Sequence, residues 1–289
     1  MTLGDLAVLS ATEIVALVKA RQISPVEVVE ASLDRIERCN PTLNAVVTLN
    51  EQAIEDAIAL EASIKSSSDT HVLCGVPVGI KDLTPVAGLR TTYGSPIFSD
   101  HIPTEDAIIV QRLRSEGAII VGKTNTPEFG AGASTFNEVF GRTRNPWNPE
   151  RTSGGSTGGG AAALASGMIG IAEGSDLGGS LRIPASFCGL VGLRPSPGLV
   201  PTHPTEWLWD ELSVNGPMAR TAEDVALALQ VMAGSDSRSP RSQSIQGRDF
   251  SSGIREVQID GLRFGYCPDV AGLGIDPEIA EVCLSLIHI

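Results

Sequence analysis

Apolar residues recur every three or four positions near the start of the chain, which is the pattern of amphipathic helices. Ser10–Glu13 and Ser24–Glu27 both have the form of a capping box, in which serine and glutamate satisfy the first free N–H groups of a helix. Pro25 follows the second cap at the first helical position, where proline is favoured. The expected elements are a helix after each cap, the second ending at Asn40-Pro41, a third helix over 51–65 and a loop over 66–69.

Beyond this region the pattern changes to short, continuous apolar runs, which are typical of buried strands. Val76–Ile80 is one such run, and it ends at Lys81-Asp82. Ala118–Val121 is another, and it follows a predicted helix over 106–116 through Gly117. A helix joined by glycine to an apolar strand is the order of elements in layered α/β proteins, so we expect an α/β fold.

Small residues dominate the segment from Ser153 to Gly198, where Gly159 to Met168 can form a helix that lets neighbouring backbone approach closely. We expect one domain over 1–289, with an N-terminal helical segment over about 1–70 and a catalytic core over about 71–235. The later expected elements are a helix capped by Thr221 and ending at Gly234, a surface loop over 235–252, a strand over 262–266, and a helix opened by Asp276-Pro277.

Composition and charge then narrow the class of protein. The chain has 289 residues, of which 42% are hydrophobic, so it can bury a sizeable core. It holds 21 Lys and Arg against 34 Asp and Glu, a net charge of −13, with no basic run. Nucleic-acid binders need cations that displace phosphate counterions, so we expect neither nucleic acid nor an anionic membrane as the main partner.

The cysteines and histidines are too scattered to form a metal site or a disulfide framework. None of the five cysteines forms Cys-x-x-Cys, and none of the four histidines forms a His-x-x-x-His pair. We therefore predict no metal and no cofactor, and we interpret Cys188 as a small buried hydrophobe. Asp5 and Glu13 lie where a signal peptide needs apolar residues, and the weakly polar stretch 158–172 is too short to span a bilayer, so a cytoplasmic location is expected.

Two segments rich in glycine and serine carry candidate chemistry, Gly154–Gly159 and Gly174–Ala185. A Gly-Gly-Ser turn exposes consecutive backbone N–H groups that can hold a phosphate or the oxyanion of an acyl-transfer intermediate. Phosphate binding is disfavoured because no lysine follows either cluster, as a P-loop requires. The dinucleotide fingerprint is disfavoured as well, since it needs a preceding strand and 142–152 is polar and broken by proline.

Acyl transfer needs an activated hydroxyl and a base, and serine with lysine is a known alternative to serine with histidine. Lys81 ends an apolar run, where desolvation can remove its charge and make it a base. Taken alone, Ser180 is more typical of a turn, and Lys81 with Asp82 could form a solvated surface ion pair of little energetic value.

These segments together resemble the amidase signature family. The resemblance spans most of the chain and implies a mixed, twisted central sheet flanked by helices, from which the C-terminal part of the family's longer domain is missing here. The matching motifs are Gly75–Asp82, Gly122–Asn125, Asn145–Trp147, the two glycine and serine clusters, Phe187–Gly189 and Gly216–Arg220.

The resemblance implies a role for each matching residue. Ser180 would be the nucleophile, Ser156 a relay bound through a cis peptide after Gly155, and Lys81 the neutral base. The resemblance also implies that the oxyanion site is formed by the N–H groups of Leu177, Gly178, Gly179 and Ser180. Asp176 and Arg182 would support this loop. Gly130 and Thr157 would line the substrate site, and Thr157 replaces the family's second serine.

The predicted function is hydrolysis of non-peptide carboxamide C–N bonds in a small-molecule substrate, with a homodimer left open. One alternative is an α/β-hydrolase in which Gly154–Gly158 fits Gly-x-Ser-x-Gly and Ser156 is the nucleophile, with His203 or His288 as its base. A second is the amidotransferase component that acts on misacylated tRNA, although the acidic charge and the segment Pro127–Gly130 favour a stand-alone amidase. The third is an inactive, truncated fragment.

Overall fold

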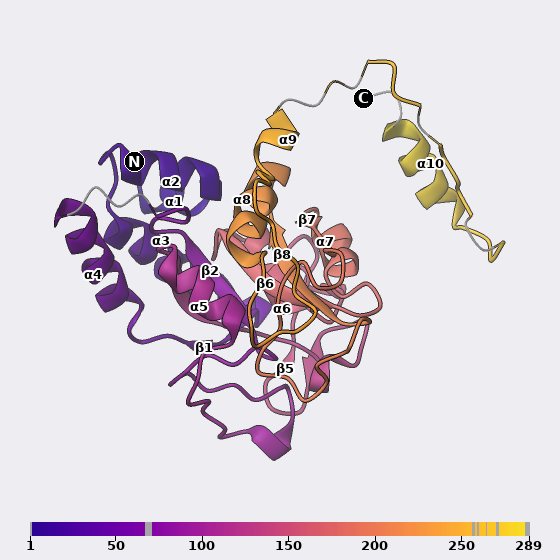
Figure 1. Cartoon of the computed structure of the whole chain (residues 1–289). Helices are drawn as coiled ribbons and strands as arrows, with labels where there is room; N and C mark the ends of the chain where they lie inside the picture. The colour runs from indigo at the N-terminus through magenta and orange to yellow at the C-terminus, as the bar shows by residue number, and fades with distance from the viewer. Residues whose placement is uncertain are drawn as a thin grey trace. The chain divides into compact units, whose positions relative to one another are not determined.

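The computed structural model describes residues 2–66, 71–255, 258, 260–263, 265–269 and 272–286. The chain divides into two compact units, Met1–Arg255 and Glu256–Ile289. The first unit holds a six-stranded mixed sheet with helices packed on it (Figure 1), which confirms the predicted α/β fold class. The expectation of one domain over 1–289, with its helical segment and core, stays a prediction.

The main sheet combines parallel and antiparallel strands in the order β1-β3-β2-β6-β8-β7. Strands β3, β2 and β6 run parallel, while β1, β8 and β7 pair antiparallel with their neighbours. A separate two-stranded sheet pairs β4 with β5. The strands are β1 Val46–Leu49, β2 Pro77–Lys81, β3 Ile119–Thr124, β4 Phe136–Asn137, β5 Gly141–Arg142, β6 Ile171–Asp176, β7 Val191–Gly192 and β8 Val214–Ala219.

The α-helices lie mostly where the caps and periodicity predict them. They are α1 Leu3–Ala7, α2 Ala11–Lys19, α3 Pro25–Leu43, α4 Ala53–Ser66, α5 Ile108–Ser115, α6 Gly158–Ala165, α7 Arg182–Cys188, α8 Ala222–Met232, α9 Ser252–Arg255 and α10 Pro277–Ser285, with short 3₁₀ turns at Pro96–Phe98 and Glu128–Gly130. Both predicted capping boxes form, at Ser10 and at Ser24. Within the described ranges, no helix is both long and apolar enough to cross a lipid bilayer.

One predicted boundary and one predicted strand are wrong. Helix α3 continues through Pro41 to Leu43, because the Asn40 side chain accepts hydrogen bonds from the backbone N–H groups of Ala45 and Val46 and Asn44 ends the helix in the left-handed conformation. The strand expected over 262–266 does not form, since the described residues of that segment have no regular structure. Most of the loop predicted over 66–69 lies outside the described residues.

Buried apolar side chains form two clusters, in line with the alternation of strand side chains between the two faces of a sheet. One cluster joins Val78 and Ile80 of β2 to α2, α5 and α8, and the other joins Ile119 and Val121 of β3 to α3, α6 and α7. Because β2, β3 and β6 are parallel, their last residues meet at one edge of the sheet, where the glycine and serine loops also lie.

The glycines of α6 let the first turn of this helix press against that edge. A Cβ atom on Gly159 would lie 2.2 Å from the backbone nitrogen of Asn125, just beyond β3, so only glycine fits there. This close approach fixes the loop before α6, which carries Ser156, against the ends of the central strands.

Candidate active site

Lys81 and Ser156 meet at the carboxyl edge of the sheet. Lys81 is the last residue of β2 and has no exposed surface, and Ser156 is 2% exposed. The Lys81 Nζ atom donates a hydrogen bond of 2.7 Å to Ser156 Oγ and one of 3.0 Å to Ser175 Oγ. The peptide bond between Gly155 and Ser156 is cis, as the family resemblance implied.

Burial lowers the pKa of the Lys81 amine to about 7, although the carboxylates of Glu173 and Asp176 act in the opposite direction. An amine with this pKa is partly uncharged at neutral pH, so it can take a proton from a hydroxyl group that it contacts. The alternative of a solvated Lys81–Asp82 ion pair is wrong, because Asp82 is also buried and accepts hydrogen bonds from Thr92 instead.

Ser180 lies in the loop between β6 and α7, and its side chain is partly exposed. Its carbonyl accepts a hydrogen bond of 3.2 Å from the Thr157 N–H, which joins the two glycine and serine loops. In the described part of the chain, the Ser180 hydroxyl has no hydrogen bond to Ser156 or to any other group. The structure therefore brings Lys81 and Ser156 into contact and places Ser180 on the adjoining loop with a free hydroxyl.

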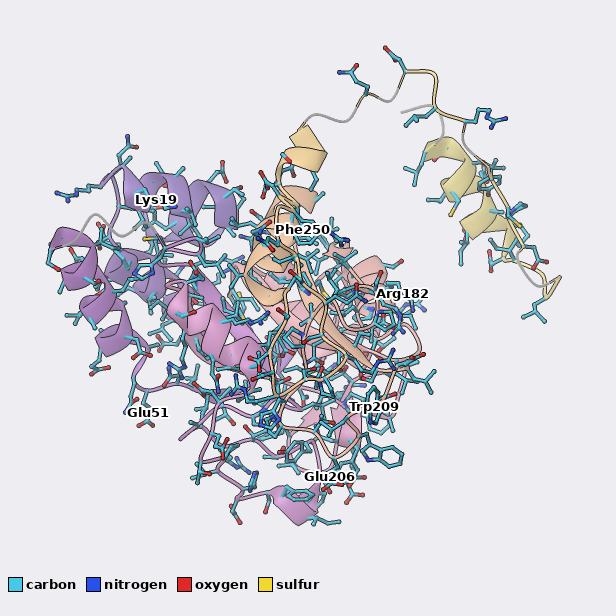
Figure 2. All side chains as sticks on the ribbon, viewed as in Figure 1. Lys19, Glu51, Arg182, Glu206, Trp209 and Phe250 are labelled. Atoms are coloured by element: carbon cyan, nitrogen blue, oxygen red, sulfur yellow. The ribbon has the colours of Figure 1, made fainter. Side chains whose placement is uncertain are left out.

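The Asp176 carboxylate organises the loop that carries Ser180. It accepts hydrogen bonds from the N–H groups of Gly179 at 2.8 Å and Leu181 at 3.1 Å, and two at 3.0 Å from the Arg182 side chain, which Figure 2 labels at the start of α7. Burial alone would raise the pKa of Asp176, but these hydrogen bonds outweigh it and hold the pKa well below its ordinary value. The predicted support by Asp176 and Arg182 corresponds to real contacts with this loop.

Because of these contacts, only some of the predicted oxyanion donors have a free N–H group. The Gly179 N–H already donates to Asp176, so it is not free to bind a substrate oxygen. Among the described residues, no acceptor is present for the N–H groups of Leu177, Gly178 or Ser180. Leu177 is 61% exposed, so a substrate can approach this part of the loop.

The two residues predicted to line the substrate site lie differently. Gly130 has a φ of 72°, and a Cβ atom there would lie 3.5 Å from Ser156 Oγ, so this backbone does border the candidate site. Thr157 is fully buried and its hydroxyl donates to the Ser175 carbonyl, so its side chain supports the end of β6 rather than lining a substrate site.

Several polar residues near Lys81 were missed by the sequence reasoning. Ser175 accepts the second hydrogen bond of Lys81, and the fully buried Glu173 accepts the backbone N–H of Lys81. Lys123 is also fully buried and bonds to Thr84, which donates to Glu173. Burial raises the pKa of Glu173 and lowers that of Lys123 to about 8. A signal for both existed, since Glu173 interrupts the small and apolar run before Ser175 and Lys123 ends an apolar run as Lys81 does.

The aromatic side chains beside Gly130 were also missed. Phe129 is 54% exposed, and its ring packs edge-on against Phe98 at 6.2 Å. Phe98 in turn packs against Tyr93 at 5.1 Å. An exposed aromatic group therefore directly precedes the glycine that borders Ser156.

The rival assignments find little support in the described residues. No histidine there makes a hydrogen bond with Ser156, as the α/β-hydrolase alternative requires, and His288 lies outside the described residues. Over the same ranges, no group of three or more His, Cys, Asp and Glu side chains could hold a metal ion. Cys188 is buried, and burial raises the pKa of its thiol to about 12, in agreement with its interpretation as a buried hydrophobe.

The chain matches one protein-family model and is similar to several known proteins. The family model described as Amidase matches residues 27–288. The chain is 44% identical to the A-type subunit of the glutamyl-tRNA(Gln) amidotransferase of Carboxydothermus hydrogenoformans, over 96% of this chain and 57% of the relative. It is 41% identical to an acylamidase of Rhodococcus erythropolis, over 99% of this chain and 60% of the relative.

Among solved structures, 6-aminohexanoate cyclic dimer hydrolase complexed with substrate is similar with a TM-score of 0.86 and 34% identity, over 97% of this chain and 58% of that one. The chain thus spans less than two thirds of the length of each of these three proteins.

Proposed function

Because this chain belongs to the amidase family, we propose that it hydrolyses the C–N bond of a carboxamide, with Ser180 as the nucleophile and Ser156 and Lys81 as its proton relay. The observation that carries this proposal is the 2.7 Å contact between the fully buried Lys81 amine and the Ser156 hydroxyl. A buried, uncharged amine bonded to a hydroxyl is the arrangement that a serine–lysine base requires.

In the proposed reaction, Lys81 accepts a proton from Ser156, and Ser156 accepts one from Ser180. For this step the 2.7 Å contact runs in the opposite direction, with Ser156 donating to the lone pair of the uncharged amine while Ser175 still accepts an N–H of Lys81. The Ser180 oxygen then attacks the amide carbon, and the relay returns the proton to the leaving nitrogen as the C–N bond breaks. Water enters by the same route and releases the acid from the acyl-enzyme.

Backbone donors would stabilise the oxyanion that forms on the substrate carbonyl. We assign this task to the N–H groups of Leu177, Gly178 and Ser180, since the Gly179 N–H is bonded to Asp176. Such donors act without reorganising during the reaction, and the loss of one costs about 2.7–4 kcal/mol of barrier in enzymes that use them. Asp176 and Arg182 would hold the loop in place for this purpose.

We propose a small amide as the substrate, by analogy with the acylamidase and the cyclic dimer hydrolase to which the chain is similar. A cytoplasmic location and a stand-alone or homodimeric enzyme belong to the same proposal. The second candidate is a component of a tRNA-dependent amidotransferase, which the 44% identity to the Carboxydothermus protein favours. The net charge of −13 favours the small-amide hydrolase, because a tRNA partner is itself an anion.

A panel of aliphatic, aryl and glutamine amides, assayed for released ammonia or amine, tests the proposal. We expect release by the chain alone, loss of release in Ser180→Ala, and full activity in Ser186→Ala, a matched change at an exposed serine of α7. Release that appears only from glutamine, and only with added partner proteins, would favour the amidotransferase component. Equal release by Ser180→Ala and Ser186→Ala would refute the assignment of Ser180.

A further inference from the structure

A cluster of ionisable side chains lies buried beside Lys81, and the proposed reaction uses none of them. Glu173, Lys123 and Asp82 all have no exposed surface. Buried charges are costly unless other charges and hydrogen bonds compensate them, so these groups must balance one another or Lys81.

Glu173 is held as a hydrogen-bond acceptor. Its Oε2 atom accepts the backbone N–H of Lys81 at 3.2 Å, and its Oε1 atom accepts the Thr84 hydroxyl at 3.0 Å. A protonated carboxyl group would need to donate a hydrogen bond, whereas a carboxylate only accepts. The contacts of Glu173 therefore suit the anion.

Lys123 supplies the compensating cation. Its Nζ atom donates to the Thr84 carbonyl and, at 2.9 Å, to the Thr91 hydroxyl. It also lies 4.0 Å from the Asp82 carboxylate, which is the closest ion pair within this cluster. Thr84 thus bonds to both Glu173 and Lys123, and it holds a carboxylate and an ammonium group close together in the buried interior.

Of the other charges that face Lys81, each anion already has cationic or hydrogen-bond partners of its own. Asp176, also on β6, pairs with Arg182 and Arg194. Asp82, next to Lys81 in the chain, accepts from Thr92 and lies near Lys123. Among the described residues, Glu173 has no ion pair within 4.0 Å, so it is the anion of the three without a cation in direct contact, and it is also the carboxylate that most strongly favours the charged form of the Lys81 amine.

We propose that Glu173 is a positioning residue whose negative charge keeps the buried Lys81 amine basic enough to accept the proton of Ser156. Burial without an anion nearby would weaken the amine as a base, because the ammonium group that it becomes would have no stabilising partner. Lys123 and the Thr84 hydroxyl favour the ionised form of Glu173 and so oppose the rise in its pKa that burial causes. This inference deepens the proposed function and rests on Lys81 being the base.

The titration of Lys81 by NMR tests this directly and needs no turnover. The chain has only four lysines, Lys19, Lys65, Lys81 and Lys123, so ¹³Cε-lysine labelling gives a spectrum that arginine substitutions at the other three can assign. The pH at the midpoint of the Lys81 titration is compared between the unchanged chain, Glu173→Gln and Thr84→Val. Glu116→Gln is the matched control, since Glu116 also accepts a backbone N–H but lies before β3, at the opposite end of the parallel strands.

We expect Glu173→Gln to lower the Lys81 midpoint by about one pH unit or more. Thr84→Val should lower it in the same direction by roughly a few tenths of a pH unit, because Glu173 loses one of its hydrogen bonds. Glu116→Gln should leave it unchanged. An unchanged or higher midpoint in Glu173→Gln overturns the inference, and if that variant does not fold, an unchanged midpoint in Thr84→Val does so.

The two proposals can fail separately. If a fluorophosphonate does not label Ser180 while Glu173→Gln still lowers the Lys81 midpoint, the proposed amide hydrolysis is wrong and the role of Glu173 stands. If Ser180 is labelled and the Lys81 midpoint does not move, the role of Glu173 is wrong and the proposed function stands.

Discussion

Replacement of Lys81 by methionine is expected to stabilise the fold at neutral pH. Burial moves the pKa of this lysine from 10.5 to about 7. Each pH unit of such a difference corresponds to about 1.4 kcal/mol, so the folded chain carries a penalty of roughly 5 kcal/mol below pH 7 for burying an amine that is charged when unfolded. Methionine has a similar length and removes this penalty, while it leaves the Ser156 and Ser175 hydroxyls without their partner, at a cost of about 1–3 kcal/mol.

The net gain for Lys81→Met should be about 2–4 kcal/mol at pH 7, measured by urea unfolding. Between pH 7 and 10.5 the unfolded chain binds a proton that the folded chain does not, so the stability of the unchanged chain rises with pH through this window. The difference in unfolding free energy between Lys81→Met and the unchanged chain should therefore shrink as the pH approaches 10. Lys19→Met, at an exposed lysine of α2, is the matched control and should change stability by less than about 0.5 kcal/mol. If this difference in unfolding free energy is constant from pH 6 to 10, Lys81 keeps its proton in the folded chain.

Three further predictions concern the same edge of the sheet. The rate at which a fluorophosphonate labels Ser180 should rise with pH through about 7, as Lys81 loses its proton, and a flat profile from pH 6 to 9 would contradict the relay. Asp176→Asn should lower the free energy of unfolding at pH 7 by about 1–3 kcal/mol. This difference from the unchanged chain should become smaller below about pH 4, because a carboxylate with a depressed pKa stabilises the fold only where it is ionised. Urea unfolding at both pH values checks this. Gly159→Ala should destabilise the chain by about 1–3 kcal/mol, since its Cβ would meet the Asn125 backbone, whereas Gly178→Ala, with nothing within 4 Å, should change thermal stability little.

Helices α2 and α3 could be predicted because the signals that start them are local. The capping boxes at Ser10 and Ser24 specify where α2 and α3 begin, and both form. The end of α3 could not be read in the same way. It depends on the Asn40 side chain bonding to the following backbone, and the Asn-Pro sequence by itself predicts an earlier stop.

The fold class and the contact between Lys81 and Ser156 followed from motifs, whereas the surroundings of Lys81 did not. Glu173 and Lys123 are far apart in sequence and come together only because β6 and β3 both flank β2. The hydrogen bond from the Gly179 N–H to the Asp176 carboxylate likewise depends on the path of one loop, which composition and spacing do not specify. Charge balance around the buried Lys81 amine is thus a tertiary property of this end of the sheet.

The most decisive measurement is the identity of the serine that a fluorophosphonate modifies, obtained by peptide mapping of the labelled chain. We expect the label on Ser180, with labelling slowed by about a hundredfold or more in Lys81→Met, on the scale of the loss of a general base. A label on Ser156 with Ser180 unmodified, or equal labelling rates with and without the Lys81 amine, would contradict the proposed chemistry.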